Sequence, residues 1–472
     1  MSDAPAEKRR PHRAKVIPFG QQGRSPERLA AFSDDALALR FAELHAADLR
    51  YVDRWSTWMH YDGMRWRADD TLAVFDSARA VCRTAAESAK PKLAKELTSA
   101  KTVAAVERLA RSDRRLAATA DQWDAEPWLL NTPKGTIDLR TGSMREHRAS
   151  DFITHMTSVA PSASGCPLWH AFLDRVTKGD EALQQYLQRM CGYAATGLTR
   201  EHALFFLWGN GGNGKGTFVS TTASVLGDYH RTAPIETFTA TFSDRHPTDL
   251  AGLRGARLVT ATETEEGRRW AEAKIKTLTG GDQISARFMR QDFFDYLPQF
   301  KLMISGNHKP GLRSVDEAIR RRFNLIPFMV TILQEERDVE LGDKLKAEWP
   351  GILRWMLDGC VDWQECGLAP PQAVTAATAA YLDAQDSIAA WLDECCDRDP
   401  NAWERSQTLF ASWKAWAERS GQFVGDIKTF RDRLDGRDGI KFRKQPTTKR
   451  AGFQGVHLRL LEEPPVDPYY DR

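Results

Sequence analysis

The sequence predicts an α/β fold in which a parallel sheet carries a phosphate-binding loop, with an α+β domain before it and a winged-helix-like domain after it. Three observations support this prediction. Six apolar residues lead directly into a glycine-rich loop that ends on a lysine, which is typical of a buried strand entering a phosphate site. Two further strand-like runs, at 257–262 and 300–306, end in polar residues. Near the end of the chain, two helical patterns precede a pair of strands.

Length and composition limit the classes of protein to which the chain can belong. Its 472 residues are enough for about two to four domains. The 66 lysines and arginines nearly balance the 64 aspartates and glutamates, so we expect any nucleic-acid surface to be a local patch. The seven cysteines follow no metal-ligand spacing, which indicates reduced thiols in a cytoplasmic protein. No apolar stretch is long enough to cross a membrane.

The patterns along the chain predict five parts. Residues 1–33 are rich in basic residues and poor in apolar ones, which predicts a disordered arm; a solvated tail is the commoner role, and contact with nucleic acid is the alternative. Residues 34–161 combine helices with aromatic hairpins and predict an α+β domain whose aromatic face is more often a core than a base-stacking surface. The remaining parts are the region of the glycine-rich loop at 162–335, a helical region at 336–396 and the winged-helix-like domain at 397–472.

The glycine-rich loop is the first candidate site. Its glycines allow the backbone N–H groups to turn toward a polyphosphate, and Lys215 can reach the β- and γ-phosphates. The loop departs from the pattern G-x-x-x-x-G-K-[ST], because Gly216 stands where the Mg²⁺-binding hydroxyl is expected and Thr217 comes one position later. An ordinary strand–helix turn is the alternative. The candidate nucleotide-binding residues are Gly209, Asn210, Gly211, Gly212, Asn213, Gly214, Lys215, Gly216 and Thr217.

Polar side chains follow the next two strand-like runs. Glu263 and then Glu265 are candidates for managing Mg²⁺ and an attacking water, since an acid at the carboxyl end of a parallel strand beside a phosphate loop suits that task. The alternative is that these glutamates merely begin a helix. Asn307 follows the third run, where its amide can orient water against the γ-phosphate or simply form the turn.

Basic residues form two more candidate sites ahead of the C-terminal domain. Arg321 and Arg322 close a short helix, where one of them can act as an arginine finger on a neighbouring subunit's nucleotide or only complement the helix dipole. The alternation at 284–297 predicts a projecting hairpin with Arg287 and Arg290 near its tip. Such a hairpin can grip a phosphate backbone; an ordinary surface hairpin is the alternative.

The last strand pair predicts a DNA-binding wing. Residues 440–450 contain five basic residues and no acid. Lys441, Arg443 and Lys444 are therefore the candidates for contact with the DNA backbone, and a solvated loop is the alternative.

Five motifs in a fixed order resemble the superfamily 3 helicase domain of phage and plasmid primase-helicases, a group that includes satellite-phage and poxvirus replication proteins. They are Gly-Asn-Gly-Gly-Asn-Gly-Lys-Gly-Thr, Glu-Thr-Glu-Glu-Gly, Leu-Thr-Gly-Gly-Asp, Gly-Asn-His-Lys-Pro and Asp-Glu-Ala-Ile-Arg-Arg-Arg-Phe. The resemblance covers about 165–335, and 35–160 resembles the domain that precedes this helicase. It implies an AAA+-like P-loop NTPase core in a DNA helicase that hydrolyses ATP and forms a homo-hexameric ring. Relatives often carry a primase domain at the N-terminus, and residues 1–33 are too few for one, so we expect a separate primase or initiator as partner.

The resemblance also implies roles for the matching residues. Lys215 and Thr217 would contact the phosphates and the metal, and Glu263 and Glu265 the metal and the water. Asn307 would sense the γ-phosphate. Arg321 and Arg322 would be the finger candidates, since Arg320 stands where the family often has an aromatic residue, and the hairpin with Arg287 and Arg290 would contact DNA.

Two other functions stay open. Gly-Lys-Gly-Thr also occurs in adenylate-kinase-like loops, which suggests a small-molecule phosphotransferase, although the Asn307 and arginine motifs argue against it. The glycine at 216 suggests instead a catalytically weak, ATP-binding subunit that initiates replication. Binding of ATP without turnover would favour this second alternative.

Overall fold

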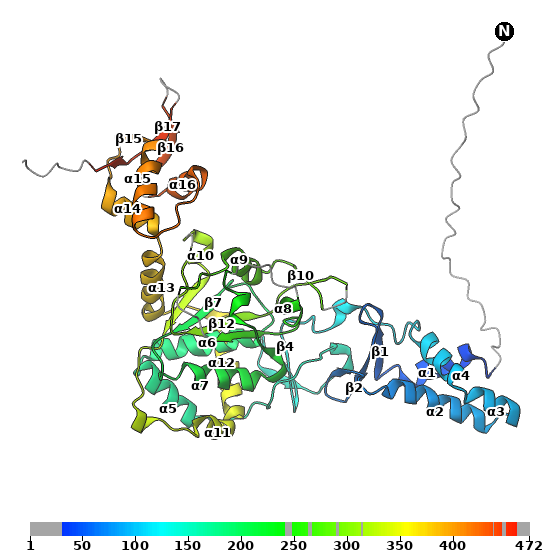
Figure 1. The fold of residues 1–472 in the computed structure, drawn as a ribbon. Helices are drawn as coiled ribbons and strands as arrows, with labels where there is room; N and C mark the ends of the chain where they lie inside the picture. The colour runs from blue at the N-terminus through cyan, green and yellow to red at the C-terminus, as the bar shows by residue number, and fades with distance from the viewer. Residues whose placement is uncertain are drawn as a thin grey trace, which may run out of the picture. The chain divides into compact units, whose positions relative to one another are not determined.

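The computed structural model describes residues 31–240, 248–262, 267–288, 292–312, 315–437, 439–445 and 450–459. They divide into two compact units (Figure 1). The first unit comprises the residues up to Tyr61 together with 67–120, and the second comprises 62–66 and the residues from Asp121 onward. Within the described residues, no helix combines the length and the apolar character needed to cross a membrane.

The first unit packs four helices against a small antiparallel sheet. Trp58 lies in its core, where the indole N–H donates to the Glu107 carboxylate at 2.5 Å. The aromatic face predicted for this hairpin therefore contributes to the core at Trp58. The elements are α1 (Asp34–His45), β1 (Leu49–Val52), η1 (Asp53–Trp55), β2 (Thr57–Tyr61), β3 (Trp66–Ala68), α2 (Ala73–Glu87), α3 (Pro91–Leu97) and α4 (Ala100–Ala110).

A five-stranded parallel sheet organises the second unit. Its strands are β7 (Leu204–Trp208), β8 (His230–Thr232), β9 (Leu258–Thr262), β12 (Lys301–Gly306) and β13 (Phe323–Pro327), in the order β13-β7-β12-β9-β8. Alternate residues of β7 face opposite sides: Phe205 and Leu207 belong to one buried cluster, and Leu204 and Phe206 to the other. Because both faces are covered, the central strands β7 and β12 are largely apolar runs, as the sequence predicted, whereas the edge strand β8 is polar.

Helices cover both faces of this sheet. The cluster that contains Phe205 includes residues of α5 (Pro167–Thr177), α6 (Glu181–Ala195), α7 (Lys215–Leu226), α11 (Leu341–Lys346) and α12 (Trp349–Cys366). The opposite cluster includes residues of α8 (Thr248–Ala251), α9 (Glu272–Gly280), α10 (Glu317–Arg320) and α13 (Gln372–Ala384). Helices α6 and α12 approach closely through glycines, since a Cβ on Gly192 would lie 2.1 Å from the Cys360 nitrogen.

The segment 121–161 belongs to the second unit, whereas the sequence pattern placed 34–161 in one domain. It carries the antiparallel strands β4 (Leu129–Thr132), β5 (Gly135–Asp138) and β6 (Ser143–Arg145), which include the predicted hairpin. Arg257, at the start of β9, donates to the Leu129 and Ala195 carbonyl oxygens at 2.5 and 2.7 Å. These bonds tie the segment to the parallel sheet.

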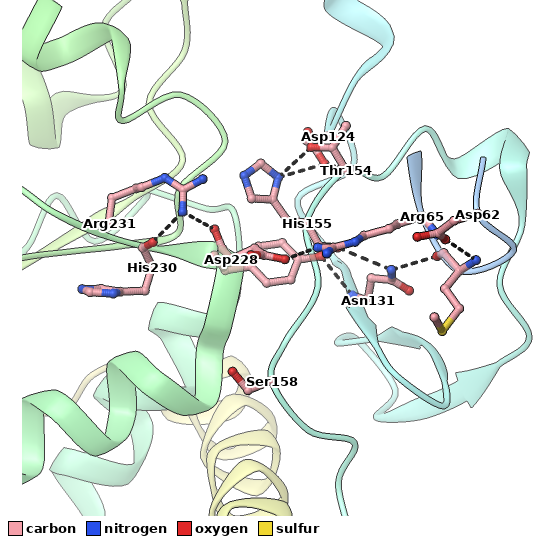
Figure 2. Close-up of polar contacts among 12 residues, drawn as sticks. Asp62, Arg65, Asp124, Asn131, Thr154, His155, Ser158, Asp228, His230 and Arg231 are labelled. Carbon is pink, nitrogen blue, oxygen red and sulfur yellow. Dashed lines mark hydrogen bonds and ion pairs between the residues drawn. The ribbon is translucent and has the colours of Figure 1, made fainter. Parts of the chain in front are cut away.

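A polar network continues this attachment (Figure 2). The Arg65 guanidinium forms an ion pair with Asp228, which lies in the 3₁₀ turn after α7. The Asn131 backbone N–H donates to the Tyr229 hydroxyl at 3.0 Å, and Asp124 accepts from the Thr154 backbone N–H at 2.8 Å. These polar contacts add to apolar packing, since Leu130, Ile137 and Leu139 lie in the same buried cluster as Phe205. Short 3₁₀ turns complete the second unit: η2 (Ala120–Gln122), η3 (Ala149–Asp151), η4 (Gly227–Tyr229), η5 (Ile235–Thr237) and η6 (Gln334–Glu336).

Two β-rich pieces follow the pattern that the sequence predicted. The hairpin forms from β10 (Ile284–Ala286) and β11 (Phe294–Tyr296), with strands shorter than expected. The C-terminal region has a third strand besides the predicted pair, giving the sheet order β15-β17-β16. Its elements are α14 (Ser387–Cys395), β14 (Cys396–Asp397), β15 (Trp403–Arg405), α15 (Ser406–Arg419), α16 (Ile427–Leu434), β16 (Lys441–Lys444), β17 (Ala451–Gln454) and β18 (His457–Leu458).

Helix α14 packs in the C-terminal core, although the sequence placed it in the helical region 336–396. Ile388, Trp391 and Leu392 of α14 share one buried cluster with residues of α15, α16 and β17. The boundary therefore lies nearer to the end of α13 than the pattern suggested.

Candidate functional site

The glycine-rich loop, residues 209–214, joins the end of β7 to the start of α7. Gly214 has a φ of +86°, a left-handed conformation in which a Cβ would lie 2.6 Å from Val176 Cγ1. Only glycine satisfies both conditions without strain. The loop can therefore turn sharply and begin α7 with Lys215 as its first residue.

Lys215 points back into the loop. Its Nζ donates to the Gly209 carbonyl oxygen at 2.6 Å, to the Asn210 carbonyl oxygen at 3.4 Å, to Asn213 Oδ1 at 3.1 Å and to Asn307 Oδ1 at 3.1 Å. The side chain is buried, and burial lowers the pKa of the Lys215 ammonium. All four acceptors are neutral oxygens, and none of the described residues places a carboxylate on this ammonium. A buried cation whose partners are all neutral is well suited to binding an anion such as a phosphate.

Asn307 reaches this lysine because β12 lies beside β7. Gly306 and Trp208 are paired at the carboxyl ends of the two strands. The Trp208 indole N–H donates to the Asn307 carbonyl oxygen at 3.1 Å, and the Lys309 ammonium lies 3.7 Å from the centroid of a Trp208 ring. The structure thus brings together two predicted residues, Lys215 and Asn307. It adds Trp208 and Lys309, which the sequence analysis did not single out. In the sequence alone, Trp208 is simply the last residue of an apolar run.

Of the residues predicted to hold Mg²⁺ and position the water, Thr217 lies within the described residues and the two glutamates do not. Gly216 and Thr217 lie in the first turn of α7, and a Cβ on Gly216 would meet no atom within 4 Å. Glu263 and Glu265 lie outside the described residues; β9, which ends at Thr262, is the neighbour of β12. Within the described ranges, no group of three or more histidine, cysteine, aspartate or glutamate side chains could hold a metal ion.

The consecutive arginines at the end of α10 differ in their environments. Arg320 forms an ion pair with Asp383, with its Nη1 3.4 Å from Asp383 Oδ1. Arg322 is buried: its guanidinium donates to Thr279 Oγ1 at 3.1 Å and to the Ala318 carbonyl oxygen at 2.7 Å, and burial lowers its pKa. Arg321 is exposed. Of the two finger candidates, therefore, only Arg321 presents its side chain to the surroundings.

The candidate DNA-contacting residues lie on the two β-rich pieces. Arg287 follows β10, and its guanidinium lies 4.7 Å from the centroid of the Phe293 ring. Arg290 lies outside the described residues. Lys441, Arg443 and Lys444 are exposed on β16, which is an edge strand of its sheet.

The chain is similar to two protein families and to viral proteins named as helicases. Residues 38–178 match the family described as "D5 N terminal like", and residues 207–322 match a family of unknown function, DUF5906. A protein of Acanthamoeba polyphaga mimivirus named "Putative helicase L207/L206" is 24% identical over 283 residues, which are 55% of this chain and 29% of that protein. "Putative helicase 022R" of Frog virus 3 is 23% identical over 264 residues, covering 50% of this chain and 26% of that protein.

A solved structure resembles most of the fold. The A form apo structure of the NrS-1 C-terminal region matches with a TM-score of 0.50 and 9% identity, over 90% of this chain and 100% of that one. At this identity the likeness concerns the fold alone. The chain spans less than a third of the length of the two viral relatives.

Proposed function

We propose that this chain, a relative of the phage and viral primase-helicases, is an ATP-dependent DNA helicase of a phage- or plasmid-type replication system. The relationship expected from the five motifs is confirmed by the D5-type match and the helicase-named viral relatives. The observation that carries the proposed activity is the 3.1 Å contact between Lys215 Nζ and Asn307 Oδ1 at the ends of two adjacent parallel strands. Ligands of open α/β sheets bind at the carboxyl ends of the strands.

In this proposal, ATP binds in the glycine-rich loop with its γ-phosphate toward Asn307. Lys215 would exchange its neutral acceptors for phosphate oxygens, which it binds more strongly because they are charged. Asn307 would orient the attacking water. Thr217 and Glu263 would hold Mg²⁺ and Glu265 would position the water; bound Mg²⁺ supplies neutralisation of the phosphate charge.

In this proposal, each ATP-hydrolysis site takes residues from two neighbouring subunits of a homo-hexamer. Arg321 is the preferred arginine finger, because Arg322 is committed to Thr279 and Ala318 within its own chain. In known phosphoryl-transfer enzymes, such an arginine contributes roughly 10³–10⁵ in rate.

The basic residues of the two β-rich pieces would contact the DNA. Arg287 and Arg290 would do so from the hairpin inside the ring, and Lys441, Arg443 and Lys444 from a winged-helix-like domain. Phosphate contacts of this kind position a protein on DNA without reading its sequence. A separate primase or initiator would be the partner at the origin.

The second candidate function is an ATP-binding initiator subunit with little turnover. It is favoured by one observation: Gly216 provides no hydroxyl where the metal ligand is expected, although a side chain would fit there. Binding of ATP without hydrolysis would distinguish this function from a helicase.

Steady-state ATP hydrolysis by the full chain, with and without single-stranded DNA and over a range of protein concentration, tests the proposal. DNA should stimulate ATP hydrolysis by the native chain, and the hydrolysis rate per subunit should increase as the protein concentration rises. Lys215→Ala should abolish turnover, and Lys344→Ala, an exposed lysine paired with Asp338, should leave it unchanged. ATP binding without turnover in the native chain would favour the initiator subunit.

A further inference from the structure

The segment 328–337, which follows β13 and which we name the strap, lies along the glycine-rich loop. One hydrogen bond joins the strap to the end of β7, and two join it to the loop. The Phe328 N–H donates to the Trp208 carbonyl oxygen at 2.7 Å, Asn213 Nδ2 donates to the Phe328 carbonyl oxygen at 2.8 Å, and the Ile332 N–H donates to the Gly212 carbonyl oxygen at 2.9 Å. The strap is therefore part of the wall of the candidate site.

Arg337, the last residue of the strap, lies directly against the loop backbone. Its Nε donates to the Ile332 carbonyl oxygen at 3.1 Å, which fixes the plane of the guanidinium. A Cβ on Gly212 would lie only 2.4 Å from Arg337 Nη2, so glycine at this position leaves the space that the guanidinium occupies. Within the described residues, the two Nη groups of Arg337 have no acceptor.

The neighbouring charges leave Arg337 available for an anion. Glu336 is adjacent in sequence, but its carboxylate accepts from Arg175 Nη2 of α5 at 2.6 Å. Because that hydrogen bond stabilises the charged form, it lowers the pKa of Glu336. Arg175 also donates to the Thr331 carbonyl oxygen at 3.4 Å. Arg175 of α5 thus holds the strap in place, and the strap presents Arg337 at the loop.

The position of Arg337 identifies the part of the nucleotide that it would contact. Asn307 stands on the β12 side of β7, whereas the strap continues from β13, on the opposite side of β7. The γ-phosphate end would face Asn307, so Arg337 would face the part of the phosphate chain nearer to the nucleoside.

We propose that Arg337 is a nucleotide-binding residue that donates hydrogen bonds to a phosphate shared by ATP and ADP. The inference rests on the proposed function of the glycine-rich loop. A guanidinium fixed through its Nε presents both Nη groups in one plane, which suits the oxygens of a phosphate. Such a contact persists through the reaction, so it contributes equally to binding of the ground state and of the transition state.

The test measures ATP and ADP affinity of the full chain by displacement of a fluorescent ATP analogue, together with KM and kcat. The variants are Arg337→Ala, Arg337→Lys and the control Arg354→Ala, whose arginine pairs with Asp358 of its own helix. Arg337→Ala should weaken ATP and ADP binding alike by about 10- to 100-fold and raise KM by a similar factor with little change in kcat. Arg337→Lys should be intermediate, and the control should match the native chain.

Two further measurements keep the outcomes separate. The unfolding temperature without nucleotide should be unchanged in Arg337→Ala, because the guanidinium makes one hydrogen bond at the surface. Unchanged affinity, a loss confined to ATP, or a loss of affinity accompanied by unfolding of the nucleotide-free chain would overturn the role of Arg337. If the native chain binds neither ATP nor ADP, the proposed function fails as well.

Discussion

Replacing Asn307 by alanine should separate catalysis from stability at the candidate site. Asn307 is exposed, and its Oδ1 is one of four acceptors around Lys215 Nζ. After the substitution the ammonium keeps the Gly209 carbonyl oxygen at 2.6 Å and Asn213 Oδ1 at 3.1 Å. Because these acceptors still satisfy the ammonium, loss of the partly buried hydrogen bond to Asn307 should lower the free energy of unfolding by no more than about 2 kcal/mol.

The effect on turnover should be much larger than the effect on stability. Removing a preorganised polar group from the reacting centre typically costs about 10²–10³ in kcat, or roughly 3–4 kcal/mol of transition-state stabilisation. The KM for ATP should change little, since Lys215 and the loop still bind the phosphates.

The assay combines saturating ATP hydrolysis with thermal unfolding of the same preparations. Asn401→Ala is the matched control, because Asn401 is an exposed asparagine of the C-terminal region. A kcat of Asn307→Ala within about threefold of the native value would refute the assigned role. A drop in stability of several kcal/mol would instead mean that Asn307 supports the loop structurally.

Three other predictions concern packing, the metal ligand and pH. Gly192→Ala should lower the free energy of unfolding by about 3 kcal/mol or more in denaturant titrations, because the new Cβ meets the α12 backbone at 2.1 Å; Gly216→Ala, with open space, is the control. Thr217→Ala should raise the Mg²⁺ concentration needed for ATP hydrolysis. Adding Gly216→Ser to this variant should return the required concentration to the native value. An unchanged Mg²⁺ requirement in Thr217→Ala would exclude the Thr217 hydroxyl as a ligand. Burial lowers the pKa of His230 from 6.5 to about 4. The unfolded chain therefore binds this proton first, and the stability that neutral His230 contributes is complete above pH 6.5 and is lost as the pH falls toward about 4. Between about pH 7 and about pH 5, the unfolding temperature of His230→Gln should fall less than that of the native chain. An equal fall in the two proteins would contradict this prediction.

The strands and the loop could be predicted because local sequence determines them. Apolar runs such as 203–208 are too short for most helices and end in glycines, which indicates a buried strand and a turn. The position of β7 between β12 and β13 could not be predicted in the same way. Strand order depends on pairing between distant residues, since Leu204 of β7 pairs with Leu302 of β12 and with Phe323 of β13.

The parts of the site that escaped prediction depend on tertiary contacts. Arg321 and Arg322 are consecutive in sequence, and only the end of α10 decides that one is exposed and the other bonded to Thr279. The strap has no motif of its own. Its only available signal was Arg337 shortly after a strand of the sheet, and many arginines occupy such places without function. Segment 121–161 belongs to the second unit because Leu130 and Ile137 enter its buried apolar cluster and because Arg257 donates to the Leu129 carbonyl oxygen.

The proposed helicase couples ATP hydrolysis at Lys215 to DNA unwinding. The most direct test is separation of a forked DNA duplex by the full chain with ATP, with a non-hydrolysable ATP analogue and with Lys215→Ala. We expect strand separation by the native chain with ATP and in neither of the other two reactions. Separation that is equal with the analogue or in Lys215→Ala would contradict it, as would DNA-stimulated hydrolysis without any separation.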